Sequence, residues 1–341
     1  MNEQAGSINN NKRNLILLVA AFAAVYVIWG STYLGIKYAI QTIPSFLMGG
    51  MRFTIAGLFL YFLGRFILPG YEKPKPLHWR TSLIVGALLL AGGNGGVVIA
   101  EHYISSSMTA LLVATVPFWI VLLNWLVMRG ERPNLKVAGG LLIGFLGVWM
   151  LIAGRGATTS DAATTVTASQ ELFGSVLLIA ASLSWALGSL YGSRAESVKS
   201  PVLGAGMQML SGGVLMLLIG TVSGEWTAFD ITQVSASSWL ALAYLIAFGA
   251  IVAYTAYSWL LKNSSPAMVS TYAYVNPAIA VFLGWAIAGE TLTGQMLLGA
   301  AIIVGSVALI TSHKKDKKEE VVEENDEINI SSAGVNESYS T

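Results

Sequence analysis

The chain has 341 residues, of which 55% are hydrophobic and 11% are charged, and its formal net charge is +1. Its mean hydropathy of +0.65 is well above that of an ordinary soluble domain, so water cannot be its main solvent. The sequence contains no cysteine, which excludes disulfide bonds, thiolate metal ligands and a thiol nucleophile.

The N-terminal segment changes abruptly from polar to apolar. Residues 1–13 are polar, and we expect them to form a disordered cytoplasmic tail. The apolar run from residue 15 to about residue 36 is too long for the core of a signal peptide and ends without a small-residue cleavage pattern. We therefore interpret it as a retained first transmembrane helix.

Ten segments are long and apolar enough to cross a membrane, which takes about 20 residues of helix. Five lie at residues 15–36, 45–67, 81–101, 105–128 and 135–153. After a polar interval, five more lie at residues 172–192, 202–222, 238–260, 264–288 and 293–312. The sequence thus predicts an all-α integral membrane protein with ten transmembrane helices.

The basic residues predict the orientation of these helices, because cytoplasmic loops collect Lys and Arg. With ten spans, 16 basic residues fall on the side of the two termini, and two, Lys37 and Arg155, fall on the opposite side. We therefore expect a protein of the cell (inner) membrane with both termini cytoplasmic.

The two sets of five helices resemble each other at a shift of about 158 to 160 residues. Because each half has an odd number of spans, the second half must be inverted relative to the first, which predicts two five-helix inverted-topology repeats. Repeats of this kind place a substrate path at the interface between the halves. The matched residues include Gly30, Ser31 and Tyr33 with Gly188, Ser189 and Tyr191, Pro117 with Pro277, and Glu131 with Glu290.

Four stretches of sequence resemble the drug/metabolite transporter superfamily, and within it the EamA-type permeases with two EamA repeats. They are VIWGSTYLGIKYAI with MRFTIAGLFLYF in the first two helices, AEHYISSSMTALLVATVPFWIVLLNWLVMRGE around the fourth, and SSPAMVSTYAYVNPAIAVFLGWAIAGE in the ninth. The resemblance covers about residues 14–312. It implies a central cavity lined mainly by helices 1, 3, 4, 6, 8 and 9, and the export of amino acids, metabolites or drugs.

The resemblance also implies a domain division. A first EamA repeat occupies residues 14–154, an extracytoplasmic linker residues 155–171, and a second EamA repeat residues 172–312. Residues 313–341 begin with a dense cluster of both signs of charge, and we expect a disordered cytoplasmic tail there.

Charged residues near the membrane are the first candidates for a site. Arg52 lies about seven residues inside the second helix, where a charge costs about 2.5 to 3.5 kcal/mol. It could hold a substrate carboxylate, or it could cap helix carbonyls or pair with Glu101. Glu101 and His102 end the third helix and could accept protons or bind an amine, since His titrates near neutrality. The alternative is a solvated helix end.

Prolines and amides in the helices are the second group of candidates. Pro117 and Pro277 are predicted to interrupt the fourth and ninth helices and to free backbone carbonyls, which suits either a packing kink or a wet cavity. Asn276 adds an amide beside the second proline. Asn94 lies deep in the third helix, in a glycine run that also suits close helix packing.

Aromatic side chains with polar tips are frequent on the helices that the family uses for its cavity, and they suit amphipathic or cationic cargo. An aromatic belt at each membrane interface is the alternative. The candidates are Tyr26, Trp29, Tyr33, Trp185, Tyr191, Tyr254, Tyr257, Tyr272 and Tyr274. Glu131 and Glu290, by contrast, precede the fifth and tenth helices, and we expect them to stabilise the positive ends of these helix dipoles.

The sequence lacks several residues and motifs that particular classes of transporter and enzyme require. The first helix has no carboxylate for a small multidrug-type antiporter, and a single deep cation is too few for a sugar phosphate. No nucleophile with its base, paired carboxylates, metal-ligand cluster or phosphate-binding loop is found, so we expect no catalytic residue, metal, cofactor or nucleic acid.

The sequence therefore predicts a secondary active or facilitative transporter that exports a small neutral, zwitterionic or amphipathic metabolite, such as an amino acid or a drug-like compound, by alternating access. The alternatives are a membrane-embedded enzyme and a non-transporting receptor or scaffold. The expected partners are a small-molecule substrate and the lipid bilayer. A proton or other coupling ion and a homodimer remain open.

Overall fold

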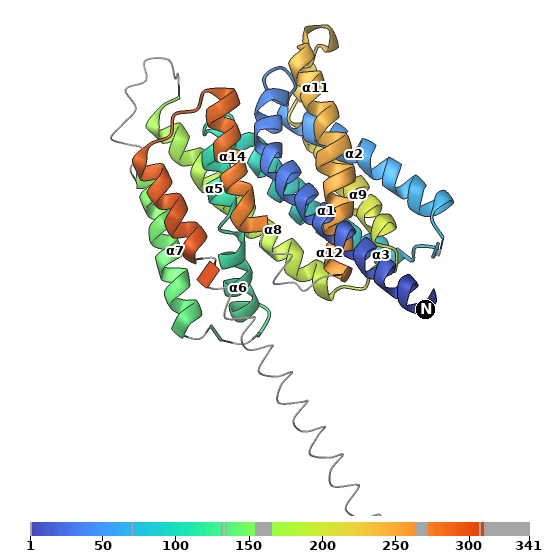
Figure 1. Cartoon of the computed structure of the whole chain (residues 1–341). Helices are drawn as coiled ribbons and strands as arrows, with labels where there is room; N and C mark the ends of the chain where they lie inside the picture. Colours follow the sequence, from blue (N-terminus) through green and yellow to red (C-terminus); the bar gives the residue numbers. More distant parts are fainter. Residues whose placement is uncertain are drawn as a thin grey trace, which may run out of the picture.

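The described part of the chain is entirely helical. The computed structural model describes residues 2–69, 71–130, 132–133, 135–153, 166–263, 272–306 and 308–309, and these ranges contain helices and no strand. The predicted C-terminal tail and most of the linker before the second half lie outside them. Figure 1 shows the helices packed side by side, with the N-terminus at one end of the bundle.

The first half contains five apolar segments. They are α1 (Asn2–Ala39), α2 (Ser45–Phe62) with its π-helical end (Leu63–Ile67), α3 (Pro76–Val85) running through a π-helical stretch (Gly86–Asn94) into α4 (Gly95–Ala100), α5 (Ser106–Val113) followed by α6 (Val116–Leu126), and α7 (Leu135–Ala153).

The second half follows the same order. It contains α8 (Ala168–Arg194), α9 (Pro201–Val222), α11 (Ala236–Tyr244) running through a π-helical stretch (Leu245–Val252) into α12 (Ala253–Asn263), α14 (Tyr272–Ala288), and an apolar helix at Gly294–Ser306. The short α10 (Glu225–Ala228) and a 3-10 turn (Ile231–Gln233) connect α9 to α11.

Seven of these helical segments are long and apolar enough to cross a membrane, and three shorter apolar helices stand where the fifth, ninth and tenth spans are predicted. The segments thus match the predicted order, although three of them fall short of a full span in the described residues. The arrangement as ten spans in two inverted repeats remains a prediction.

Two helix starts differ from the sequence-based expectation. α1 begins at Asn2, within the predicted disordered tail, because adding residues to an existing helix requires no new nucleation. α8 begins at Ala168, four residues before the predicted start at residue 172. Thr167 and Gln170 form a capping box there, in which Thr167 N–H donates to Gln170 Oε1 at 2.8 Å. Polar capping residues thus extend the helix beyond its apolar part.

The halves interleave rather than standing apart. α2 packs along α9, α1 packs against α14 and α12, and α8 packs against the third span and α6. Glycines allow the α2–α9 contact: a Cβ on Gly57 would lie 2.6 Å from the Leu210 nitrogen, and one on Gly206 would lie 2.6 Å from the Tyr61 nitrogen. Small residues let helix backbones approach this closely.

Two of the three described π-helical segments, Gly86–Asn94 and Leu245–Val252, occupy corresponding positions. They start at residues 86 and 245, which are 159 positions apart and therefore match the shift of the internal repeat. Wide turns of this kind are rare in helices and occur frequently at functional sites. Both stretches border the cavity described next.

Candidate substrate pocket

A pocket lies between helices that come from both halves. The empty space between its walls is about 890 Å³, including the opening to solvent. Ligand pockets are mostly apolar with a few polar groups. The walls are formed by Trp29, Thr32, Tyr33, Ile36, Arg52, Phe53, Leu90, Asn94, Val97, Ala110, Val113, Ala114, Val116, Pro117, Trp185, Met209, Gly249, Tyr254, Tyr272, Asn276 and Pro277.

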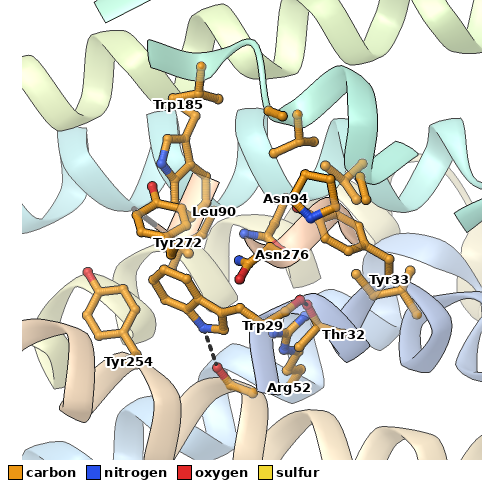
Figure 2. Close-up of a pocket in the computed structure, with 18 of the residues that line it drawn as sticks. Trp29, Thr32, Tyr33, Arg52, Leu90, Asn94, Trp185, Tyr254, Tyr272 and Asn276 are labelled. Carbon is orange, nitrogen blue, oxygen red and sulfur yellow. Dashed lines mark hydrogen bonds between the residues drawn. The ribbon is translucent and has the colours of Figure 1, made fainter. Parts of the chain in front are cut away.

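Arg52 is the cation of the pocket wall. It is 4% exposed, and its guanidinium carbon lies 4.7 Å from the centre of the Phe53 ring. Within the described residues it forms no salt bridge, and its Nε has no hydrogen-bond partner. The predicted pairing with Glu101 is therefore not made at contact distance. Figure 2 shows Arg52 beside Thr32 and below Trp29.

Gly249 brings two helices and the guanidinium together. Its carbonyl, in the second π-helical stretch, accepts a hydrogen bond of 3.2 Å from Trp29 Nε1 (Figure 2). A Cβ on Gly249 would lie 3.0 Å from Thr32 Cγ2 and 3.1 Å from Arg52 Nη2. The missing side chain thus makes room for Arg52 at the pocket wall.

Aromatic rings form one side of the pocket. The Trp29 ring lies 5.0 Å from that of Tyr257 and 5.3 Å from that of Tyr272. Tyr257 packs behind these rings and does not border the pocket. Tyr254 borders it, and its hydroxyl donates to Gln208 Oε1 at 2.7 Å. Flat rings of this kind bind apolar groups and cations.

Two amides supply neutral polar groups. Asn94 is half-buried at the pocket wall, and its neighbour Gly93 is so close to α8 that a Cβ would lie 2.9 Å from Trp185 Cε3. The glycine run therefore serves close packing while the amide faces the pocket. Asn276 is 5% exposed, and in the orientation that satisfies its amide, Nδ2 donates to the carbonyls of Tyr272 and Tyr26 at 3.3 and 3.2 Å.

The two prolines act differently. The fourth span is broken between α5 and α6, and Pro117 stands in the first turn of α6, where its missing N–H is not needed. The expectation that Pro277 also interrupts its helix is wrong, because α14 runs continuously through it. Pro277 is the sixth residue of α14, so its nitrogen leaves the Ala273 carbonyl without the usual intrahelical donor although the helix continues.

An ion pair lies at one end of the bundle, which we call the outer end because its loops are predicted to be extracytoplasmic. Lys37 Nζ donates to Glu290 Oε1 at 2.8 Å. The same oxygen accepts from Ser106 N–H at 2.9 Å and Ser106 Oγ at 2.7 Å, while Oε2 accepts from Ser107 N–H at 3.1 Å and from Ser107 Oγ. We refer to Lys37, Glu290, Ser106 and Ser107 as the outer latch.

The outer latch corrects the expected role of Glu290. The carboxylate stabilises the N-terminus of α5 in the first half, and not that of the helix that follows it in sequence. Burial by itself raises the pKa of Glu290, but the bonds from Lys37, Ser107 and Ser106 outweigh burial and lower the pKa to about 2. Glu131, its counterpart, lies outside the described residues.

The outer latch lies directly beyond the pocket. On α1, Lys37 directly follows the wall residue Ile36 and lies about one turn after the wall residue Tyr33. On α5, the wall residue Ala110 lies one turn after Ser106. The ion pair therefore lies between the pocket wall and the outer end of the bundle.

Glu101 and His102 do not act as a pair. His102 Nε2 lies 2.8 Å from Ser45 Oγ, and the side chain is exposed. Glu101 is 5% exposed and does not border the pocket, so the alternative of a solvated helix end is wrong for this carboxylate. In the described part of the chain, neither of its oxygens has a hydrogen-bond partner.

Sequence reasoning found part of the pocket wall. Trp29, Tyr33, Arg52, Asn94, Pro117, Trp185, Tyr254, Asn276 and Pro277 border the pocket, as does Tyr272. Tyr26, Glu101, Tyr191 and Tyr257 do not, and the side chain of Tyr274 lies outside the described residues. Whether any of them contacts substrate remains a prediction.

Several wall residues were missed by sequence reasoning. Thr32, Met209 and Gly249 carry no charge and stand in ordinary apolar runs, so no local signal distinguishes them. Met209 and Arg52 also show that the seventh and second helices contribute, beyond the helices that the resemblance implies. In the described ranges no three His, Asp or Glu side chains are grouped to hold a metal ion.

Known proteins match the chain over most of its length. The uncharacterized inner membrane transporter YedA of Escherichia coli (strain K12) is 37% identical over 304 residues, covering 89% of this chain and 93% of YedA. The uncharacterized transporter YvbV of Bacillus subtilis (strain 168) is 25% identical, over 87% and 92% of the two chains.

A solved structure and a family model agree with these relatives. A protein crystal structure with 20% identity superposes with a TM-score of 0.59, covering 88% of this chain and 98% of that one, which shows a shared fold. The model of the EamA-like transporter family matches twice, at residues 15–153 and 172–312. The chain therefore belongs to the EamA-like transporter family.

Proposed function

We propose that this protein is a secondary transporter of the cell (inner) membrane that exports a small neutral, zwitterionic or amphipathic metabolite by alternating access. The observation that carries the proposal is the pocket, which has walls from both halves and lies next to the outer latch. The resemblance to EamA-type exporters supports the direction, and the distribution of Lys and Arg supports a cytoplasmic position of both termini.

The chemistry of the wall favours a cargo with one carboxylate and an apolar or cationic part. Arg52 can donate two parallel hydrogen bonds to a carboxylate, which is a strong and specific contact. The faces of Trp29 and Tyr272 suit an apolar side chain or an ammonium group. A single cation in the wall does not suit a cargo with several phosphate charges. Amino acids and similar zwitterions meet these conditions.

Alternating access requires the outer latch to open. Lys37 and the two serines belong to the first half, whereas Glu290 belongs to the second. Moving one half against the other separates these partners and connects the pocket to the outer side. A corresponding movement at the opposite end would admit cargo from the cytoplasm.

The experiment has two stages. Metabolite profiling of cells with and without the protein identifies the solute that accumulates when the protein is missing. Proteoliposomes are then loaded with that solute, or with mixed amino acids, and counterflow of labelled solute is measured. We expect saturable uptake with the wild type and a loss of at least about tenfold with Arg52→Ala, since bonds to a charged group contribute about 1.5 to 3 kcal/mol.

Matched variants separate cargo recognition from folding. Arg65→Ala removes a half-buried arginine outside the pocket wall that also lies over an aromatic ring, and it should leave counterflow unchanged. Membrane abundance of each variant is measured in parallel. Absence of counterflow with every solute that the cells accumulate would favour a receptor or scaffold, and chemical conversion of the solute would favour an enzyme.

A further inference from the structure

Glu101 is a buried acid that the pocket and the outer latch leave unexplained. It directly follows α4 and its side chain is 5% exposed, yet no described residue donates a hydrogen bond to either carboxylate oxygen. An ionised carboxylate without a partner is very unfavourable in such surroundings. The observed arrangement therefore suits the neutral, protonated carboxyl.

The charged and titratable groups that act on Glu101 come from three directions. Lys37 and Tyr33 lie on α1, Arg52 lies on α2, and Glu290 follows α14. None of the described cations lies within salt-bridge distance of Glu101. α8 also packs against α4 but adds no charge to this set. Lys37 is already bound to Glu290.

Glu101 is connected through the backbone to the outer latch. A short loop, residues 101–105, connects α4 to Ser106 and Ser107, whose N–H groups hold the Glu290 carboxylate. Separating Glu290 from these serines moves the segment that begins at Glu101. Opening the outer end is therefore expected to bring water to the Glu101 carboxyl.

We propose that Glu101 is a proton-binding site whose occupation favours closure of the outer end. The proposal rests on the alternating-access movement of the proposed function. In the open form, a proton from outer water binds one carboxylate oxygen of Glu101, and the neutral group is then buried as the outer latch forms. When the proton leaves, the ionised carboxylate of Glu101 must be stabilised by water or by Lys37. In the second case Glu101 competes with Glu290 for Lys37.

The direction of the pH effect follows from linkage. The closed form buries the protonated group and so binds protons more tightly than the open form, in which the carboxyl is hydrated. Lower pH at the outer side therefore favours the closed form, and higher pH favours the open form. Within the titration range of Glu101, the ratio of closed to open molecules changes by up to about tenfold per pH unit.

The test measures the distance across the outer end. Because the chain has no cysteine, Gln41→Cys and Thr291→Cys supply two exposed labelling sites, one near each partner of the ion pair. Nitroxide labels on both sites, with the full-length protein in lipid nanodiscs, give a short distance when the outer end is closed. Pulsed electron paramagnetic resonance is recorded between about pH 5 and pH 9.

We expect the longer distance to gain population as pH rises in the wild-type background. Glu101→Gln, which keeps the shape of the neutral acid, should retain the short distance at every pH. Glu101→Asp, which can still titrate, should keep the pH response. Glu225→Gln is the matched control, since this acid also lies at the outer end and accepts hydrogen bonds from the N–H groups of Phe46 and Leu47. The distance in the Glu225→Gln variant should still change with pH.

Two results would overturn the proposal. One is a wild-type distance distribution that does not change with pH, and the other is a Glu101→Gln variant that responds to pH as the wild type does. If the Glu101→Gln variant does not fold, the pH dependence of the distance in the wild type and in Glu101→Asp tests the proposal. Counterflow at one fixed pH tests transport separately, so normal counterflow with a pH-independent distance would refute only the proton site.

Discussion

The outer latch supports a quantitative prediction for Glu290→Gln. In the structure the pKa of Glu290 is about 2, whereas its ordinary value is 4.5. Each unit of difference corresponds to about 1.4 kcal/mol, so the bonds favour the closed form by at most about 3.4 kcal/mol if Glu290 is hydrated in the open form. The Lys37 side chain is 33% exposed, and solvent screening reduces this value to about 2 kcal/mol. We therefore expect the ratio of open to closed molecules to rise about thirtyfold.

Cysteine labelling measures this change. Ile36→Cys places one thiol at a wall position that is 2% exposed and adjacent to Lys37. A membrane-impermeant maleimide added at the outer side should react with it about thirtyfold faster when Glu290→Gln is also present. Glu196→Gln is the control, because its partner Lys75 is 62% exposed and such surface pairs contribute little. An unchanged labelling rate with Glu290→Gln would refute the latch.

The pKa of Glu290 also predicts how the latch responds to acid. Because its pKa is lowered in the structure, the contribution of the carboxylate is complete above its ordinary pKa, near 4.5, and is lost only as pH falls toward about 2. Glu290 therefore stays ionised in the closed form throughout the physiological range. A conformational response to pH above about 5 must come from another group, and we assign that group as Glu101.

Three further predictions concern the pocket and its support. Gly249→Ala should lower counterflow several-fold and cost about 1 to 3 kcal/mol of stability, because the added carbon crowds the Arg52 guanidinium. Gly305→Ala is the control and should change neither quantity, because a Cβ there would meet nothing within 4 Å. Thermal unfolding measures the stability of each variant, and the counterflow assay measures its transport. Gly57→Leu should reduce membrane abundance by breaking the α2–α9 contact, and normal abundance would contradict that packing. Arg52→Ala and Asn276→Ala should lower counterflow at wild-type abundance, while a parallel loss of abundance would mean that both residues only support the fold.

Hydropathy determined most of the helix pattern. Long apolar runs must form helices in a bilayer, because every backbone N–H and C=O group needs a partner within its own segment. The sequence therefore predicted the order of the apolar segments, and Arg52 was identifiable because a charge within such a run is costly. The same reasoning missed the start of α8, since its first turn is built from polar capping residues.

Only the tertiary structure decided which residues meet. Glu290 was interpreted from its neighbours in sequence, yet it binds Ser106, 184 residues away. Gly249 was one glycine among 36 until its closeness to Arg52 gave it a role. Glu101 stands at a helix end, where sequence favours hydration, and the tertiary packing buries it instead. Hydropathy is a property of each segment alone, whereas these contacts depend on how the faces of different helices pack.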